Sequence, residues 1–220
     1  QSRFKSEFPQ KSAEVYLKAH HWYAKEGLFE EAIRSAIKGN HFVQAAETIN
    51  KLDIQVYWCN ERLIARDWLN ALPDELILSD SWLSILLAYI TLSEGRLRDS
   101  EMVFDQALSD IVEKDSFDNA RNSMLRGVIL AAKSIFSYHH HMNWNDALSQ
   151  VNLALRLIPT ELVYDRCLAY LHGGGALIQF GELTQAEEYL LYAFDLTQKN
   201  NSSGQKLLTL GNLGQLKLIQ

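Results

Sequence analysis

Apolar residues recur along this chain every three or four positions, which is the spacing of one face of an α-helix. In the first fifty residues such a stripe runs through Tyr16, Leu17, Ile33, Ala36 and Ile49. No segment shows the sustained alternation of apolar and polar residues that predicts a β-strand. The pattern therefore predicts an all-α fold.

Glycine and proline divide the N-terminal stripes into short helices. We expect helices over 12–26, from about 30 to 37 and over 42–49, since Gly27 and the Gly39-Asn40 pair interrupt the pattern, and a glycine just past a helix suits a left-handed C-cap. A further helix is predicted over 54–71, because Pro73 stops it. Residues 74–81 form a predicted polar linker, in which Asp80 or Ser81 caps the next helix. These breaks predict a helical arm or linker bundle over 1–73 and a second domain over 80–220.

In the predicted second domain the helical stripes come in pairs. The paired stripes begin at Trp82 and Val103, at Leu125 and Ala147, and at Leu168 and Ala186. A last stripe, from Leu207 to Leu218, has no partner in the sequence. Because an uncovered apolar stripe favours a further helix, we expect the protein to continue beyond Gln220.

Similar turns join the helices of several pairs. A glycine, a nearby hydrophobic residue and a small residue five positions after the glycine occur at 27–32, 95–100 and 181–186, and 142–147 is a looser copy that begins with Met142. The glycine permits a positive φ in a tight turn, and the small residue allows close approach of the second helix. Together these residues match the helix–turn–helix pattern of tetratricopeptide (TPR) repeats, with Gly174 at the close-contact position of its first helix. The intervals exceed the 34 residues of the simple repeat, so the sequence predicts an α–α superhelix of degenerate TPR-like pairs.

Composition narrows the possible functions. The 220 residues carry a net charge of −6, and the arginines are interleaved with acids, so we expect no direct DNA binding by this segment. The two cysteines, Cys59 and Cys167, are interpreted as reduced and partly buried thiols. The chain has no apolar run of membrane-spanning length and begins with a polar segment rather than a signal peptide, so the expected compartment is the cytoplasm.

Two ordered sets of motifs resemble a known family. The first set looks like the arm region of MalT-like regulators, the large ATP-binding LuxR-family transcriptional activators. It consists of His21-Trp22-Tyr23-Ala24, Gly27, Glu31-Ala32-Ile33, Ala36-Ile37, Gly39-Asn40 and Ala45-Ala46-Glu47. The second set resembles the join between that arm and the family's TPR sensor. It consists of Trp68-Leu69, Ala71-Leu72-Pro73-Asp74-Glu75-Leu76, Leu86-Leu87-Ala88, Leu92 and Gly95-Arg96-Leu97. The match covers roughly residues 10 to 110, and the remainder matches only as a generic TPR array.

The resemblance implies a regulator with an N-terminal STAND-type ATPase, a helical sensor and a C-terminal DNA-binding helix-turn-helix. This chain corresponds only to the middle, because it has neither a G-x-x-x-x-G-K-[ST] phosphate loop nor a basic recognition helix. We therefore expect no cofactor in this segment, with ATP bound only by the missing N-terminal domain of the parent. The expected partners are a small-molecule effector or a regulatory protein, together with the neighbouring domains of the parent chain.

In a TPR superhelix the first helix of each pair lines the concave face. That alignment predicts a ligand-binding groove formed by aromatic rings and a few polar groups, which suit a sugar, a small organic effector or a peptide. The candidate residues are Trp82, Tyr89, Phe136, His139, His140 and Gln179. The alternative for Trp82 and Tyr89 is that they belong to the core between repeats.

Other chemistries have little support in the sequence. Three adjacent histidines, 139–141, cannot all face one metal ion from a helix, so no metal site is predicted and a solvated helix end is expected. No catalytic residues are predicted, because the chain has neither a nucleophile elbow nor an H-E-x-x-H motif, and an enzyme is the least favoured hypothesis. The main alternative to a MalT-like sensor is a stand-alone TPR scaffold that binds a protein partner.

Overall fold

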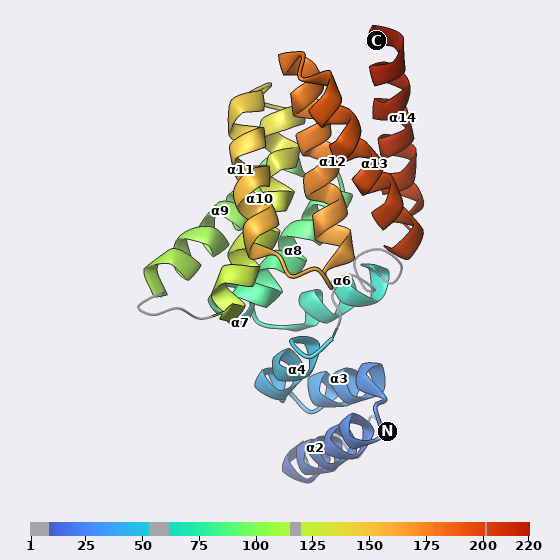
Figure 1. Cartoon of the computed structure of the whole chain (residues 1–220). Coiled ribbons are helices and arrows are strands. Elements are labelled where there is room, and N and C mark those ends of the chain that lie inside the picture. The colour runs from blue at the N-terminus through green and yellow to red at the C-terminus, as the bar shows by residue number, and fades with distance from the viewer. Residues whose placement is uncertain (1–8, 53–61, 115–119, 201) are drawn as a thin grey trace. The chain divides into compact units, whose positions relative to one another are not determined.

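The computed structural model describes residues 9–52, 62–114, 120–200 and 202–220 (Figure 1). Within these ranges the secondary structure is helical and contains no strand, which confirms the all-α prediction. The predicted helix over 54–71 is seen from Arg62 onward, and its first residues, including Cys59, lie outside the described ranges. The helices are α2 (Pro9–Lys25), α3 (Phe29–Lys38), α4 (Phe42–Ile49), α6 (Arg62–Ala71), α7 (Asp74–Ser79), α8 (Ser81–Ser93), α9 (Leu97–Lys114), α10 (Ala120–His139), α11 (Trp144–Leu157), α12 (Val163–Phe180), α13 (Leu183–Asn200) and α14 (Ser203–Ile219).

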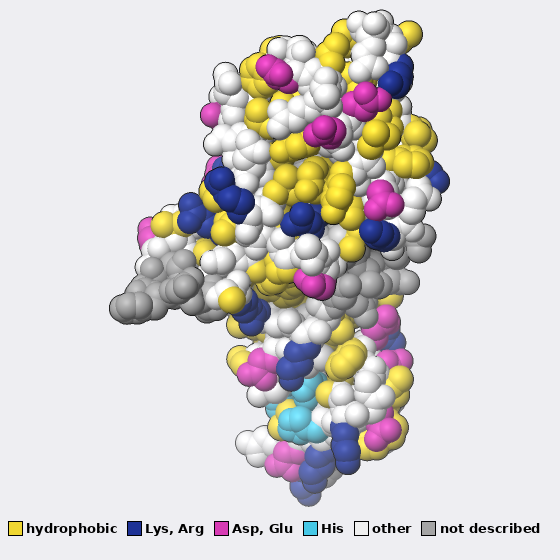
Figure 2. Space-filling model, in the orientation of Figure 1, with side chains coloured by type: hydrophobic (Ala, Val, Ile, Leu, Met, Phe, Trp, Pro, Cys, Tyr) yellow, Lys and Arg dark blue, Asp and Glu magenta, His cyan; other side chains and the backbone are white. Residues whose placement is uncertain are grey.

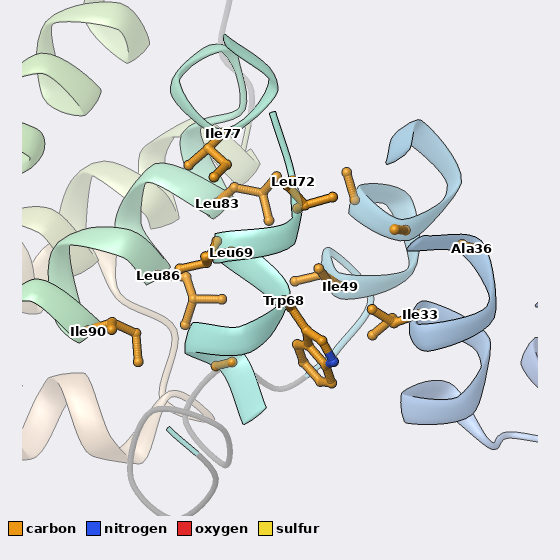
Figure 3. Packing of buried hydrophobic residues seen from close by; sticks show 13 residues of the cluster. Ile33, Ala36, Ile49, Trp68, Leu69, Leu72, Ile77, Leu83, Leu86 and Ile90 are labelled. Atoms are coloured by element: carbon orange, nitrogen blue, oxygen red, sulfur yellow. The ribbon is translucent and has the colours of Figure 1, made fainter. Parts of the chain in front are cut away.

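The chain divides into two compact units, Gln1–Val103 and Phe104–Gln220. This division falls later than the boundary that the sequence predicts between 73 and 80. The reason lies in the core of the first unit, where Ile33 of α3 and Ile49 of α4 share one cluster with Trp68 of α6 and Leu86 of α8 (Figure 3). Helices on both sides of Pro73 therefore bury their apolar faces together.

The segment expected to be a polar linker is instead a short helix, α7. Pro73 precedes it with φ −62°, and Asp74 and Glu75 occupy its first turn, where acidic side chains favour the helix dipole. Ile77 anchors the helix, since its side chain is buried in the same core. Asp80 then caps α8, because its carboxylate accepts hydrogen bonds from the backbone N–H groups of Trp82 and Leu83, as the sequence predicts.

The glycines at the predicted turns adopt left-handed conformations. Gly27, Gly95 and Gly181 have φ values between 75° and 79°, and Met142, which begins the looser copy, has φ 51°. The N-terminal break differs from expectation: Asn40, not Gly39, takes the positive φ. Gly39 is needed for another reason, since a Cβ atom there would lie 2.8 Å from Cβ of Tyr16.

The second unit is a succession of packed helices. Helix α10 packs on α11, α12 packs on both α11 and α13, and α14 packs on both α12 and α13. The first helices of successive pairs also meet, since α10 contacts α12 and α12 contacts α14. This stepwise packing of adjacent pairs is the arrangement of an α–α superhelix.

The small residues predicted to permit close approach in the turn motifs are fully buried: Ala32, Ser100, Ala147 and Ala186.

Candidate functional site

Polar and aromatic side chains from α10 and α12 form a compact cluster in the second unit. The ring of Tyr138 stacks on the ring of His172 with centroids 6.2 Å apart, and His139 meets His172 edge to face at 5.6 Å. Tyr138 and His139 also contact each other, with ring centroids 4.6 Å apart. His172 is buried, whereas Tyr138 is partly buried and His139 is exposed, so the cluster extends from the core to the surface. We call these three rings, with Ser134 and Gln179, the α10–α12 polar cluster.

Ser134 fixes the proton position of the buried imidazole. The Ser134 hydroxyl donates to the backbone oxygen of Ala131 at 2.7 Å and lies 3.0 Å from Nδ1 of His172. Because that hydroxyl has a single hydrogen, it accepts from His172, whose Nδ1 therefore carries the ring proton. This assignment follows from the hydrogen-bond network, and it leaves the lone pair of the imidazole on Nε2.

Desolvation lowers the pKa of both imidazoles of the cluster. Desolvation, with a smaller contribution from the nearby His139, lowers the pKa of His172 to about 3. The pKa of His139 is also lowered, first by desolvation and then by His140. Burial raises the pKa of Tyr138, although its hydrogen bond with Gln179 acts in the opposite direction. The cluster thus offers neutral hydrogen-bonding groups beside aromatic rings, which suits an uncharged polar ligand.

A glycine makes room for Tyr138. A Cβ atom on Gly175 would lie 2.7 Å from both Cζ and Oη of the Tyr138 ring. The absence of a side chain at this position of α12 allows the phenol of α10 to lie against the helix backbone. Gln179, one turn later in α12, then reaches the Tyr138 hydroxyl.

The six predicted site residues occupy different environments. His139 and Gln179 belong to the α10–α12 polar cluster, and His140 is exposed beside Phe136, with ring centroids 6.2 Å apart. Phe136 is 1% exposed and packs edge to face on Phe104. Tyr89 is 2% exposed within the first unit, so Phe136 and Tyr89 are core residues in this structure.

Trp82 lies in the first unit and packs partly buried against its core. Its indole Nε1 is buried without a hydrogen-bond partner among the described residues. The core placement of Trp82 and Tyr89 is the alternative interpretation given above for these two side chains.

Sequence reasoning missed Ser134 and His172 as members of the cluster. They are 38 positions apart, and each lies within an apolar helical stripe, so spacing alone gave no signal that they meet. The available signal was chemical. A serine and a histidine at positions that the helical period buries must form hydrogen bonds with each other or with the backbone.

Two further features of the structure bear on ligand binding. Among the described residues, no group of three histidine, cysteine, aspartate or glutamate side chains is placed to hold a metal ion. A surface cavity of about 170 Å³ in the first unit is lined by Arg62, Leu63, Arg66, Ile90, Ser93 and Glu94. Its volume is below the range of roughly 300–1,000 Å³ common for small-molecule pockets, and Arg66 faces Glu94 across 3.7 Å.

Comparisons with protein-family models, with curated proteins and with solved structures gave no match to this chain. Within the described residues, no helix combines the length and apolar character needed to cross a bilayer.

Proposed function

We propose that this chain is the sensing segment of a MalT-like LuxR-family transcriptional activator and that an uncharged polar effector binds at the α10–α12 polar cluster. The ATPase and DNA-binding domains of such a regulator would lie outside this chain, which would act in the cytoplasm and bind no cofactor itself. The motif order at 21–47 and 68–97 supports the family, and TPR-like pairing of the helices is part of the proposal.

The single observation that carries the binding site is the partly exposed, neutral ring cluster. Tyr138 and Gln179 present a phenol and an amide beside His139. The buried ring of His172 stacks on Tyr138 and is itself contacted by Ser134. Hydroxyl-rich ligands such as sugars combine hydrogen-bonding groups with apolar faces, so they match rings flanked by neutral donors and acceptors.

Binding would affect the parent regulator through the contact between successive helix pairs. The cluster joins α10 to α12, so a ligand held by residues of both helices would favour one packing of the two pairs over another. In the parent, such a shift would bias the equilibrium between closed and oligomerising states.

A thermal-shift screen with sugars, small metabolites and peptides tests the site. An effector is expected to raise the melting temperature of the wild type, and Gln179→Ala should weaken that effect. Gln185→Ala, at an exposed glutamine of α13, is the matched control and should retain the wild-type shift. Equal shifts in Gln179→Ala and Gln185→Ala would contradict the site.

The full gene tests the family. An upstream phosphate loop and a downstream helix-turn-helix are expected, and their absence would contradict the MalT-like proposal. A stand-alone TPR scaffold for a protein partner is the second candidate, and the exposed leucines of α14 favour it.

A further inference from the structure

The surface cavity of the first unit lies between two helices that bring charges of opposite sign. Helix α6 contributes Arg62, Leu63 and Arg66, and the last turn and C-cap of α8 contribute Ile90, Ser93 and Glu94. Arg62 and Arg66 are one helical turn apart, so the helical period places them on the same face of α6. The cavity therefore has a cationic side on α6 and an anionic side at the end of α8.

The cationic side has hydrogen-bond donors available for a ligand. Among the residues that the structure describes, none forms an ion pair or a hydrogen bond with Arg62. Arg66 approaches the carboxylate of Glu94 at 3.7 Å, which is too long for a hydrogen bond. A guanidinium is always charged and presents its N–H donors in a planar fork that matches a carboxylate. The two arginines can therefore bind the carboxylate of a small molecule.

The carboxylate of Glu94 is available on the anionic side. Its side chain is 33% exposed, and it lies 3.7 Å from Arg66 and 3.7 Å from Arg96. Arg96 is held more closely by Asp99, at 2.8 Å. Because neither arginine is within hydrogen-bond distance of Glu94, its oxygens can accept from a cationic group of a ligand.

The end of α8 adds to the anionic side. The carbonyl groups at a helix C-terminus concentrate partial negative charge, which favours a cation there. The hydroxyl of Ser93 donates to the backbone oxygen of Ile90 at 2.7 Å, so the hydroxyl oxygen remains an acceptor. A ligand's ammonium group at this end would meet a carboxylate, a hydroxyl oxygen and the helix dipole.

The dimensions and surroundings of the cavity restrict its ligand to a small molecule. Its volume of about 170 Å³ corresponds to about five or six water molecules at roughly 30 Å³ each. On the face of the chain drawn in Figure 2, Lys and Arg side chains are interspersed with Asp and Glu and form no extended patch. A nucleic acid would require such a patch. Leu63 and Ile90 add apolar surface to the lining.

We propose that this cavity binds a small free α-amino acid with an apolar side chain, such as alanine or valine. The carboxylate of the amino acid accepts from Arg62 and Arg66, and its ammonium group donates to Glu94. An α-amino acid carries its two charges on neighbouring atoms of one carbon, which matches a cavity whose Arg66 and Glu94 are 3.7 Å apart. Binding thus gives a closed arrangement of alternating charges, separate from the α10–α12 polar cluster and independent of it.

Isothermal titration calorimetry of the whole chain with L-alanine and L-valine tests the proposal. Propionate and ethylamine are the comparison probes, because each carries only one of the two charges. Alanine and valine should bind saturably and at least about tenfold more tightly than either comparison probe. Absence of saturable binding by both amino acids would overturn the proposal. Propionate binding as tight as that of alanine would overturn it too, because the cavity would then be a simple anion site.

Two substitutions separate the two sides of the cavity. Arg62→Gln should weaken alanine binding by at least about tenfold, and Glu94→Gln should abolish the preference for alanine over propionate. Arg34→Gln and Glu47→Gln, at exposed positions of α3 and α4, are the matched controls and should bind alanine as the wild type does. Urea unfolding establishes that each variant folds. Wild-type alanine affinity in Arg62→Gln, or an unchanged preference in Glu94→Gln, would contradict the assignment.

A variant of the α10–α12 polar cluster distinguishes this site from the proposed effector site. Gln179→Ala should bind alanine with wild-type affinity, because Gln179 belongs to the second unit and the cavity belongs to the first. Loss of alanine binding in this variant would overturn the independence of the two sites.

Discussion

Nδ1 of His172 lies 3.0 Å from the hydroxyl of Ser134, and this contact joins helix α10 to helix α12 inside the second unit. The contact places an uncharged imidazole beneath Tyr138 and His139, where it supports the exposed part of the cluster. The stability of the protein should therefore depend on the protonation of this one buried ring.

The pH dependence of stability should report His172. Its pKa is about 3 in the folded protein and near 6.5 when unfolded, so the unfolded chain binds more protons between these values. The contribution is complete above pH about 6.5 and is lost as the pH falls toward 3, with a slope of roughly 1.4 kcal/mol per pH unit. Urea unfolding at pH 6.5 and pH 5 measures it. His172→Gln should flatten the slope, and equal slopes in wild type and His172→Gln would exclude the assignment.

Alanine at Gly174 and at Gly214 should have opposite effects on the free energy of unfolding. At Gly174 the added Cβ meets the Leu190 side chain at 2.7 Å, so we expect a loss of roughly 1–2 kcal/mol. At Gly214 it meets open space, so the better helix propensity of alanine should add up to about 1 kcal/mol. Chemical denaturation measures both, and destabilisation of similar size at the two positions would contradict the packing described for α14.

Replacing Met142 with glycine should stabilise the folded protein. Its φ of 51° lies in the left-handed region, which a side chain disfavours. We expect Met142→Gly to raise the free energy of unfolding by about 0.5–1 kcal/mol, the remainder of the strain being offset by the greater freedom of glycine when unfolded. Gly181→Ala, at φ 77°, is the reverse change and should cost about 1 kcal/mol. Thermal unfolding of both variants tests the prediction, which fails if Met142→Gly melts below the wild type.

Asp80 should contribute to the first unit in two ways. One carboxylate oxygen caps α8 and the other accepts from the side-chain amide of Asn50 at 2.6 Å. Asp80→Ala should cost about 1–2 kcal/mol, and Asp80→Ser should recover part of that loss because serine also caps a helix. Urea unfolding distinguishes them, and identical losses in the two variants would show that the cap is unimportant.

The local features of the fold were predictable because they depend on a few neighbouring residues. The left-handed turns at Gly27, Gly95 and Gly181 follow from the conformational freedom of glycine, and the cap of α8 follows from the carboxylate of Asp80. The helix α7 was missed because it is stabilised by the packing of Ile77 into the core. The local sequence does not reveal that contact.

The candidate site was only partly predictable for a related reason. His139 and Gln179 were named from helix alignment, but the meeting of Ser134 with His172 depends on how α10 and α12 pack. The helix alignment placed Phe136 and Tyr89 in a groove, yet both side chains are buried in the core. Their helices have wide apolar stripes, and these residues belong to the stripes.

Nuclear magnetic resonance of ¹³C-labelled histidine and tyrosine rings during titration with an effector from the thermal-shift screen is the most direct test of the proposed site. The account predicts that the ring signals of Tyr138 and His172 shift together and saturate at the effector concentration that saturates the thermal shift. The ring of His20, buried in the first unit 3.1 Å from the backbone oxygen of Ala32, should stay unchanged. Saturable binding that leaves the Tyr138 and His172 signals unmoved would contradict the account.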